Sequence, residues 1–193
     1  MNVSGSIRKS RLVQLVGNLN NKLNIFMNKN TVEKKIERCV DKLYKDDKYL
    51  FESKVCERCL MFRLAYYLQM AFPDYFVDCE FNKMGFKNYK YMEKVEPSEQ
   101  GRKLKKMFAD IIIHKRNSNV QDNFICLEIK PTKKGMDTDS ERLKNMTRKN
   151  GFRHKGRKYI YAYDFGFFIY LPKDKTRSEI RIFENGAETQ LTS

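Results

Sequence analysis

The stretch "NFICLEIKP" (Asn123–Pro131) has the composition of a buried strand, yet it places two opposite charges near its end. Side chains two apart on a strand point to the same face. We therefore expect Glu128 and Lys130 to share one face, while Leu127 and Ile129 point the other way into a core. The charged pair is either a surface ion pair, which would contribute little to stability, or half of an active site.

A second acid stands in the preceding apolar segment, "FADIIIH" (residues 108–114). Strand alternation puts Asp110 and Ile112 on one face, and Ala109, Ile111 and Ile113 on the other. An acid in such a strand is unfavourable unless it is paired, hydrogen-bonded or bound to metal. A cap at the strand end is the simpler alternative for Asp110.

The spacing of the two acids predicts that they are neighbours. Seventeen residues lie between Asp110 and Glu128, which suits a hairpin that sets them side by side on adjacent strands. Two adjacent carboxylates repel each other, and Mg²⁺ is commonly held by one or two carboxylates together with substrate phosphate. Lys130 could then orient the attacking water or stabilise charge on a scissile phosphate.

The pattern Asp110…Glu128-Ile129-Lys130 resembles the PD-(D/E)xK nuclease superfamily, in particular its small stand-alone bacterial or phage members. Ala109 stands where the motif often has proline. The resemblance covers residues 50–172, because the order of expected helices and strands also matches. It implies a restriction-endonuclease-like α/β core with a mixed sheet of four or five strands flanked by helices.

The resemblance also implies a ligand set and an activity. Asp110, Glu128 and the carbonyl of Ile129 would bind Mg²⁺, with Mn²⁺ as a substitute, and Lys130 would position or activate water. Glu57 would complete the site directly or through water. It heads a predicted helix and precedes Met61, Leu64 and Leu68 at apolar spacing, although the helix dipole alone favours an acid there. The implied reaction is endonucleolytic hydrolysis of phosphodiester bonds in DNA, in defence against foreign DNA or in a phage counterpart.

The charge balance independently favours a polyanionic partner. Lys and Arg number 39 against 24 Asp and Glu, which gives a net charge of +15. Nucleic acid is the leading partner, DNA favoured over RNA, with an acidic membrane surface the main competitor. No apolar run is long enough to span a membrane. A homodimer and a gating protein partner are further candidates that the sequence leaves open.

Basic residues gather on both sides of the acidic motif and are the expected phosphate contacts, although a run of charge is more often simply solvated. They are Lys103, Lys105, Lys106, Lys133, Lys134, Arg148, Arg153, Lys155, Arg157 and Lys158. His114 could approach a substrate phosphate, although packing is the commoner role for such a histidine. His154 is a further candidate phosphate contact.

The five cysteines form no disulfide-like framework, which favours a reducing, cytoplasmic compartment. Cys56 and Cys59 form a single CxxC. Without a second pair it is a poor zinc signal. The helical spacing of the two cysteines leads us to expect that both side chains pack in the hydrophobic core.

The chain divides into a basic N-terminal arm and helix (1–48) and the nuclease-like domain (49–193). Helices are predicted at 30–47, 53–72 and 138–149, capped by Asn30 or Thr31, by Ser53, and by Asp139 or Ser140, respectively. Strands are predicted at 75–81, 106–114, 124–130, 159–171 (bent at Gly166) and 179–184. Residues 82–103 are expected to form a long loop, 150–158 a basic loop and 185–193 a tail.

The leading interpretation is a metal-dependent nuclease. The alternative is a catalytically silent nuclease-like module that binds nucleic acid or a protein partner. A third is an RNA-binding protein in which the acids merely cap strands. Metal dependence separates the first from the other two.

Overall fold

The computed structural model describes residues 27–53, 55–84, 88–95, 102–116, 122–132, 134–172 and 178–191 of the chain. The part of the predicted arm before residue 27, and residues 117–121 of the predicted hairpin connection at 115–123, lie outside these residues.

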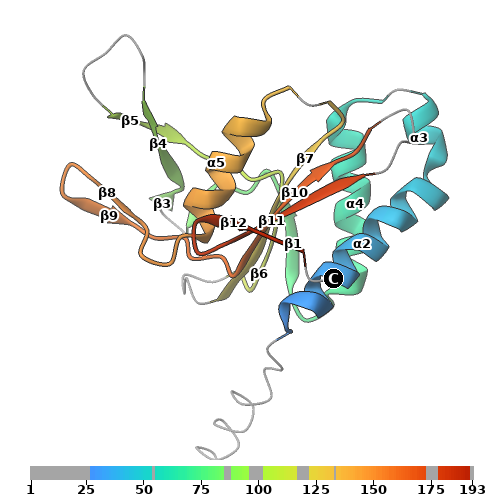
Figure 1. The fold of residues 1–193 in the computed structure, drawn as a ribbon, viewed down its shortest axis with the longest axis horizontal. Helices are drawn as coiled ribbons and strands as arrows, with labels where there is room; N and C mark the ends of the chain where they lie inside the picture. The colour runs from blue at the N-terminus through green and yellow to red at the C-terminus, as the bar shows by residue number, and fades with distance from the viewer. Residues whose placement is uncertain are drawn as a thin grey trace, which may run out of the picture.

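A mixed sheet of six strands forms the centre, in the order β1-β6-β7-β10-β11-β12 (Figure 1). The strands are β1 (Phe76–Cys79), β6 (Ile111–His114), β7 (Asn123–Lys130), β10 (Phe165–Tyr170), β11 (Glu179–Glu184) and β12 (Ala187–Thr189). Only β7 and β10 run parallel; the other neighbouring pairs are antiparallel. The α/β class is confirmed, but the expected four or five strands were too few.

The additional strand comes from the predicted tail. Asn185 and Gly186 both have positive φ angles, 49° and 82°, and they reverse the chain between β11 and β12. An Asn-Gly pair is the preferred sequence for such a tight turn, because both residues tolerate a left-handed backbone. The tail interpretation overlooked this signal.

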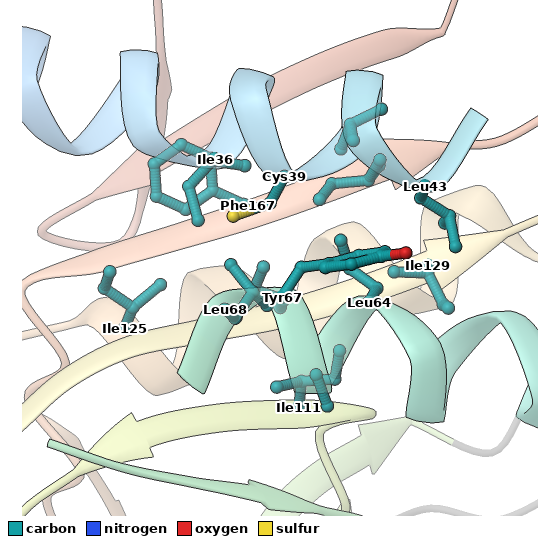
Figure 2. Packing of buried hydrophobic residues seen from close by; sticks show 14 of the residues in the cluster. Ile36, Cys39, Leu43, Leu64, Tyr67, Leu68, Ile111, Ile125, Ile129 and Phe167 are labelled. Carbon is teal, nitrogen blue, oxygen red and sulfur yellow. The ribbon is translucent and has the colours of Figure 1, made fainter. Parts of the chain in front are cut away.

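Helices cover both faces of the sheet. Helices α2 (Lys29–Asp46), α3 (Lys48–Glu52) and α4 (Glu57–Ala71) lie on one side, and α5 (Met136–Thr147) lies on the other (Figure 1). Figure 2 shows side chains of α2 and α4 meeting Ile111, Ile125 and Ile129 of the sheet. Each fully buried Leu or Ile in this layer contributes about 1.5–3 kcal/mol. Helix α2 thus shares a core with α4 and the sheet.

The apolar stripe predicted for the helix headed by Glu57 is buried, but the first residues of the three predicted helices were misplaced. Helix α2 starts after Asn28, whose side chain accepts from the N–H of Thr31 at 2.8 Å. Helix α4 starts after Cys56, whereas Ser53 ends α3. Helix α5 starts after Gly135, which has a φ of 84°. The competing polar residues nearby made the choice of cap ambiguous.

Strands replace much of the predicted irregular structure. The expected loop at 82–103 contains β2 (Lys83–Met84), β3 (Asn88–Tyr89) and β4 (Tyr91–Val95), and β4 pairs with β5 (Arg102–Lys106). The expected basic loop is a hairpin of β8 (Phe152–His154) and β9 (Arg157–Tyr159). These hairpins are rich in charged and polar residues, so they lack the apolar alternation on which strand prediction depends.

The predicted aromatic strand at 159–171 is divided. Ala162 has a φ of 50°, and only Phe165–Tyr170 belongs to the sheet. The predicted bend at Gly166 is wrong, because Gly166 pairs in register with Cys126 and Phe183. A Cβ on Gly166 would lie 3.0 Å from the Thr147 side chain, so this glycine allows α5 to pack close to the sheet. None of the helices in the described part of the chain is long and apolar enough to cross a membrane.

Candidate active site

Strand β7 separates apolar and charged side chains between its two faces, as its sequence predicts. Leu127 and Ile129 pack in the core beneath α2 and α4. Cys126 belongs to the second core cluster, on the side of α5, and Glu128 on the same face is fully buried. Lys130 lies at the end of the strand with 18% of its side chain exposed.

Asp110 lies directly before β6. Ile111 pairs with Leu127 in the antiparallel register, so Asp110, one residue before Ile111, lies beside Glu128, one residue after Leu127. Its Oδ2 accepts a hydrogen bond from the N–H of Ile129 at 2.8 Å. The expected alternation fails at Ala109, which joins the cluster of Ile112 because the regular strand begins only after Asp110.

The backbone of Ile129 also points toward Asp110. The carbonyl of Lys130 accepts from the N–H of Leu171, beside β10. In a strand, the N–H and C=O groups of one residue point to the same side, and those of the next residue point to the opposite side. The Ile129 carbonyl therefore points to the β6 side, where its N–H meets Asp110.

Glu128 is only partly satisfied. Its Oε2 accepts from Nη1 of Arg142, while its buried Oε1 has no hydrogen-bond partner. Burial, followed by the charge of Asp110, raises the pKa of Glu128 well above its usual range. Burial also raises the pKa of Asp110, despite the hydrogen bond from Ile129. The ionised forms of both carboxylates are therefore disfavoured without a further cation.

Lys130 is held by acids other than Glu128. Its Nζ donates to Oε1 of Glu57 at 2.8 Å and lies 3.6 Å from Oδ2 of Asp139. Burial acts to lower the pKa of Lys130, but the hydrogen bond to Glu57 and the nearby carboxylates outweigh it, so the pKa is raised. Lys130 is accordingly an ammonium at neutral pH. The surface ion pair between Glu128 and Lys130 that the sequence allowed is not formed.

Two residues of α5 at this site were missed. Asp139 was expected to cap the helix, but it lies inside α5, with 6% of its side chain exposed. Arg142 joins Glu128 to Asp139, with its Nη1 at 3.4 Å from Asp139 Oδ1. Asp139 shares an apolar stripe with the buried Leu143 and Met146. The criterion that selected Glu57, an acid at the head of such a stripe, would have found it.

A cavity of about 780 Å³ opens beside these groups. Asp110, Lys130, Asp139 and Arg142 lie in its wall. Asp137 and Glu141 of α5 add acids, while Lys105 and Lys106 of β5 add cations. Phe108, whose side chain is exposed, supplies an aromatic face.

The predicted phosphate contacts are divided between this cavity and more distant surfaces. Lys105 and Lys106 line the cavity. The larger basic group lies beyond the C-terminal end of α5, at Arg148 and on the β8–β9 hairpin (Figure 1). That 12-residue helix is roughly 18 Å long, and Lys130 and Asp139 lie near its start. Lys134 is exposed, whereas Lys133 and the side chain of Lys103 are outside the described residues.

The remaining candidates lie elsewhere. His114 is buried, with its Nε2 2.8 Å from Oδ2 of Asp78, which agrees with packing, the commoner role that the sequence analysis gave it. The sequence suggested that Cys56 and Cys59 pack in the core. This expectation is wrong, because both residues are exposed at the start of α4.

The described ranges contain no group of three or more His, Cys, Asp or Glu placed to hold a metal ion. Asp110, Glu128 and the Ile129 carbonyl form a smaller oxygen set, and Glu128 Oε1 is available within it. One or two carboxylates suffice for Mg²⁺ when substrate phosphate supplies further ligands. These residues therefore fit a divalent cation of that kind.

The charges of the cluster agree with this fit. Four carboxylates face two cations in the cluster: Glu57, Asp110, Glu128 and Asp139 against Lys130 and Arg142. With all six ionised the sum is −4 + 2 = −2, which one divalent cation would neutralise.

No protein-family model, curated protein or solved structure matches this chain.

Proposed function

We propose that the chain is a metal-dependent nuclease of the PD-(D/E)xK type that hydrolyses phosphodiester bonds in DNA. The observation that carries the proposal is the buried Glu128 Oε1, which has no hydrogen-bond partner. Glu128 lies beside Asp110, and Asp110 lines the cavity. Leaving a buried carboxylate oxygen unsatisfied is unfavourable, and such groups concentrate at functional sites.

The chain's own residues would divide the work. Asp110 and Glu128 would hold Mg²⁺ or Mn²⁺, with the Ile129 carbonyl as a third ligand, and the ion would supply Lewis-acid activation of a scissile phosphate. Lys130 is a cation fixed by Glu57 and Asp139, so it would stabilise charge on that phosphate rather than remove a proton. Glu57 thus positions Lys130 in this scheme. Lys105 and Lys106 would hold the backbone of the nucleic acid.

A catalytically silent binding module is the second candidate. It is favoured by Arg142, which already gives Glu128 a cationic partner without any metal. In that case the acids, Lys130 and Arg142 would form a closed ion-pair network, and the basic surfaces would serve binding alone.

Nicking of supercoiled plasmid tests the proposal. Purified protein is incubated with Mg²⁺, Mn²⁺ or EDTA, beside Asp110→Ala, Lys130→Ala and the control Lys42→Ala, whose side chain pairs with Asp46 on the surface of α2. We expect metal-dependent cutting that falls by at least about 100-fold in the two site variants and is unchanged in the control. Retained DNA binding without cutting by the wild type would favour the silent module.

A further inference from the structure

Cys56 and Cys59 place two accessible thiols in contact at the start of α4. Their Sγ atoms are 3.5 Å apart, and both residues are exposed. Cys56 is the N-cap of α4, and its carbonyl accepts from the N–H of Cys59 at 3.1 Å. The three-residue spacing in the first helical turn brings the two side chains to the same face.

The other cysteines are sequestered. Cys39 and Cys126 are buried, and Cys79 is partly buried. Burial raises the pKa of Cys39 and of Cys79 to about 11, which keeps both as thiols. Packing accounts for these three side chains, but it does not account for two exposed sulfurs that touch each other.

The contact makes the two exposed thiols unequal. The pKa of Cys56 is lowered, chiefly by the backbone N–H of Cys59. The side chain of Cys59 and the backbone N–H of Arg58 act in the same direction. The side-chain contact with Cys56 raises the pKa of Cys59. Free N–H groups at a helix N-terminus stabilise a thiolate in the same way in other CxxC sequences.

We propose that Cys56 and Cys59 form a reversible dithiol–disulfide couple whose oxidant is a low-molecular-weight disulfide of the glutathione type. The Cys56 thiolate attacks one sulfur of that disulfide, forming a mixed disulfide and releasing one thiolate. The Cys59 thiolate then attacks the Cys56 sulfur, and the second thiolate leaves. In total, two protein thiols lose two electrons and two protons, and the small disulfide is reduced to two thiols.

The geometry requires little movement for this step. A disulfide has an S–S length of about 2.05 Å, so the sulfurs must approach by roughly 1.5 Å, which rotation of two exposed side chains can supply. Because only Glu57 and Arg58 intervene, the closed loop is short, and its closure stabilises the disulfide little. A bond of this kind remains open to reduction.

The couple lies in the turn that faces the cavity. Glu57 holds the Lys130 ammonium at 2.8 Å, and Arg58, which lines the cavity, donates to Glu80 at 3.0 Å. Oxidation would therefore act on the turn that fixes Lys130. The couple itself requires no nuclease activity and stands apart from that proposal.

The test is a redox titration of the full, reduced chain. The protein is equilibrated in buffers that range from reduced to oxidised glutathione, quenched with acid, alkylated after denaturation and mapped by peptide mass. We expect one internal disulfide, between Cys56 and Cys59, that reduced glutathione reverses. Cys39, Cys79 and Cys126 should remain thiols at every ratio and should therefore be recovered in alkylated form.

Two variants separate the steps. Cys59→Ser removes the second nucleophile, so a glutathione mixed disulfide should accumulate on Cys56. Cys79→Ser, the matched control, should form the internal disulfide as the wild type does. The proposal is overturned if Cys56 and Cys59 remain thiols, or carry separate glutathione adducts, at every ratio. It is equally overturned if disulfides to the other cysteines form as readily.

Discussion

Two clusters of ionisable side chains lie at opposite ends of β6, and they differ in how well their charges are satisfied. At the His114 end, Asp78 accepts from Nε2 of His114 and from Nε of Arg116, each at 2.8 Å, and Arg116 adds a second bond. These partners outweigh burial, so the pKa of Asp78 lies below its usual range.

The Asp110 end also combines acidic and basic side chains, but its carboxylates are less well satisfied. The pKa values of Asp110 and Glu128 are raised, and Glu128 and Asp139 each keep a buried oxygen without a hydrogen bond. Satisfied charges such as those of Asp78 stabilise the fold. Charges that remain in excess beside an open cavity mark the place where a ligand would bind.

The largest expected effect comes from removing Arg142, which is the cation in direct contact with Glu128 among the residues that the structure describes. Arg142→Ala leaves a buried carboxylate without its partner, and the free energy of unfolding should fall by about 3–5 kcal/mol. Arg116→Ala at the other cluster should cost less than about 1 kcal/mol, because that side chain is 51% exposed. Urea denaturation measures both.

The control for Arg142 is Glu128→Gln in the Arg142→Ala background. Removing the uncompensated charge should recover part of the lost stability. If Arg142→Ala is as mild as Arg116→Ala, the two clusters do not differ as described.

Neutral isosteres of the two aspartates should change stability in opposite directions. Asp78→Asn removes a favoured carboxylate and should lower the free energy of unfolding by about 1–2 kcal/mol. Asp110→Asn removes a disfavoured carboxylate, can still accept from Ile129, and should raise it by about 1 kcal/mol while abolishing any cutting. Denaturation at neutral pH checks the signs, and equal signs would contradict the comparison.

The same two variants should differ in the pH range over which their effects vanish. The unfolded-state pKa of aspartate is about 3.9. Asp78 has a lowered folded-state pKa, so its stabilisation is present above that value and is lost as pH falls below it. Asp110 has a raised folded-state pKa, so its penalty develops as pH rises above about 3.9 and is absent below.

Denaturation series at several pH values measure this. The gap between Asp110→Asn and the wild type should close before pH falls to about 3.9, whereas the gap for Asp78→Asn should persist to that point and close below it. Gaps that close over one common range would show that the two pKa shifts do not have opposite signs.

The smallest effects concern binding. Lys105→Ala and Lys106→Ala should each weaken DNA binding a few-fold and reduce the slope of log affinity against log salt by about 1. Lys45→Ala on α2 is the control. Fluorescence anisotropy at several salt concentrations provides the measurement. An effect of Arg153→Ala larger than these would move the main binding surface to the β8–β9 hairpin.

Elements with strong apolar periodicity were predictable. Strand β11 has the predicted bounds, 179–184, and Met61, Leu64 and Leu68 of α4 are buried as expected. Strands whose side chains are mainly charged or polar, such as β5, were not, because their pairing depends on a partner strand rather than on burial. The break at Ala162 depends on a left-handed backbone at an ordinary residue, which no local pattern announces.

The site was partly predictable for the same reason. Asp110, Glu128 and Lys130 follow from the pairing of two strands, and Glu57 from the stripe of one helix. Arg142 reaches Glu128 only because α5 crosses that face of β7, a tertiary contact that is not encoded in the spacing of either element. Whether Asp110 and Glu128 bind metal remains a prediction.

Calorimetric titration with Mn²⁺ tests the central claim, that the excess charge at the Asp110 end forms a cation site. We predict one Mn²⁺ bound per wild-type chain, unchanged binding by Asp78→Asn, and binding at least about tenfold weaker in Glu128→Gln and Asp110→Asn. Absence of binding to the wild type, or equal binding by all four proteins, would contradict it.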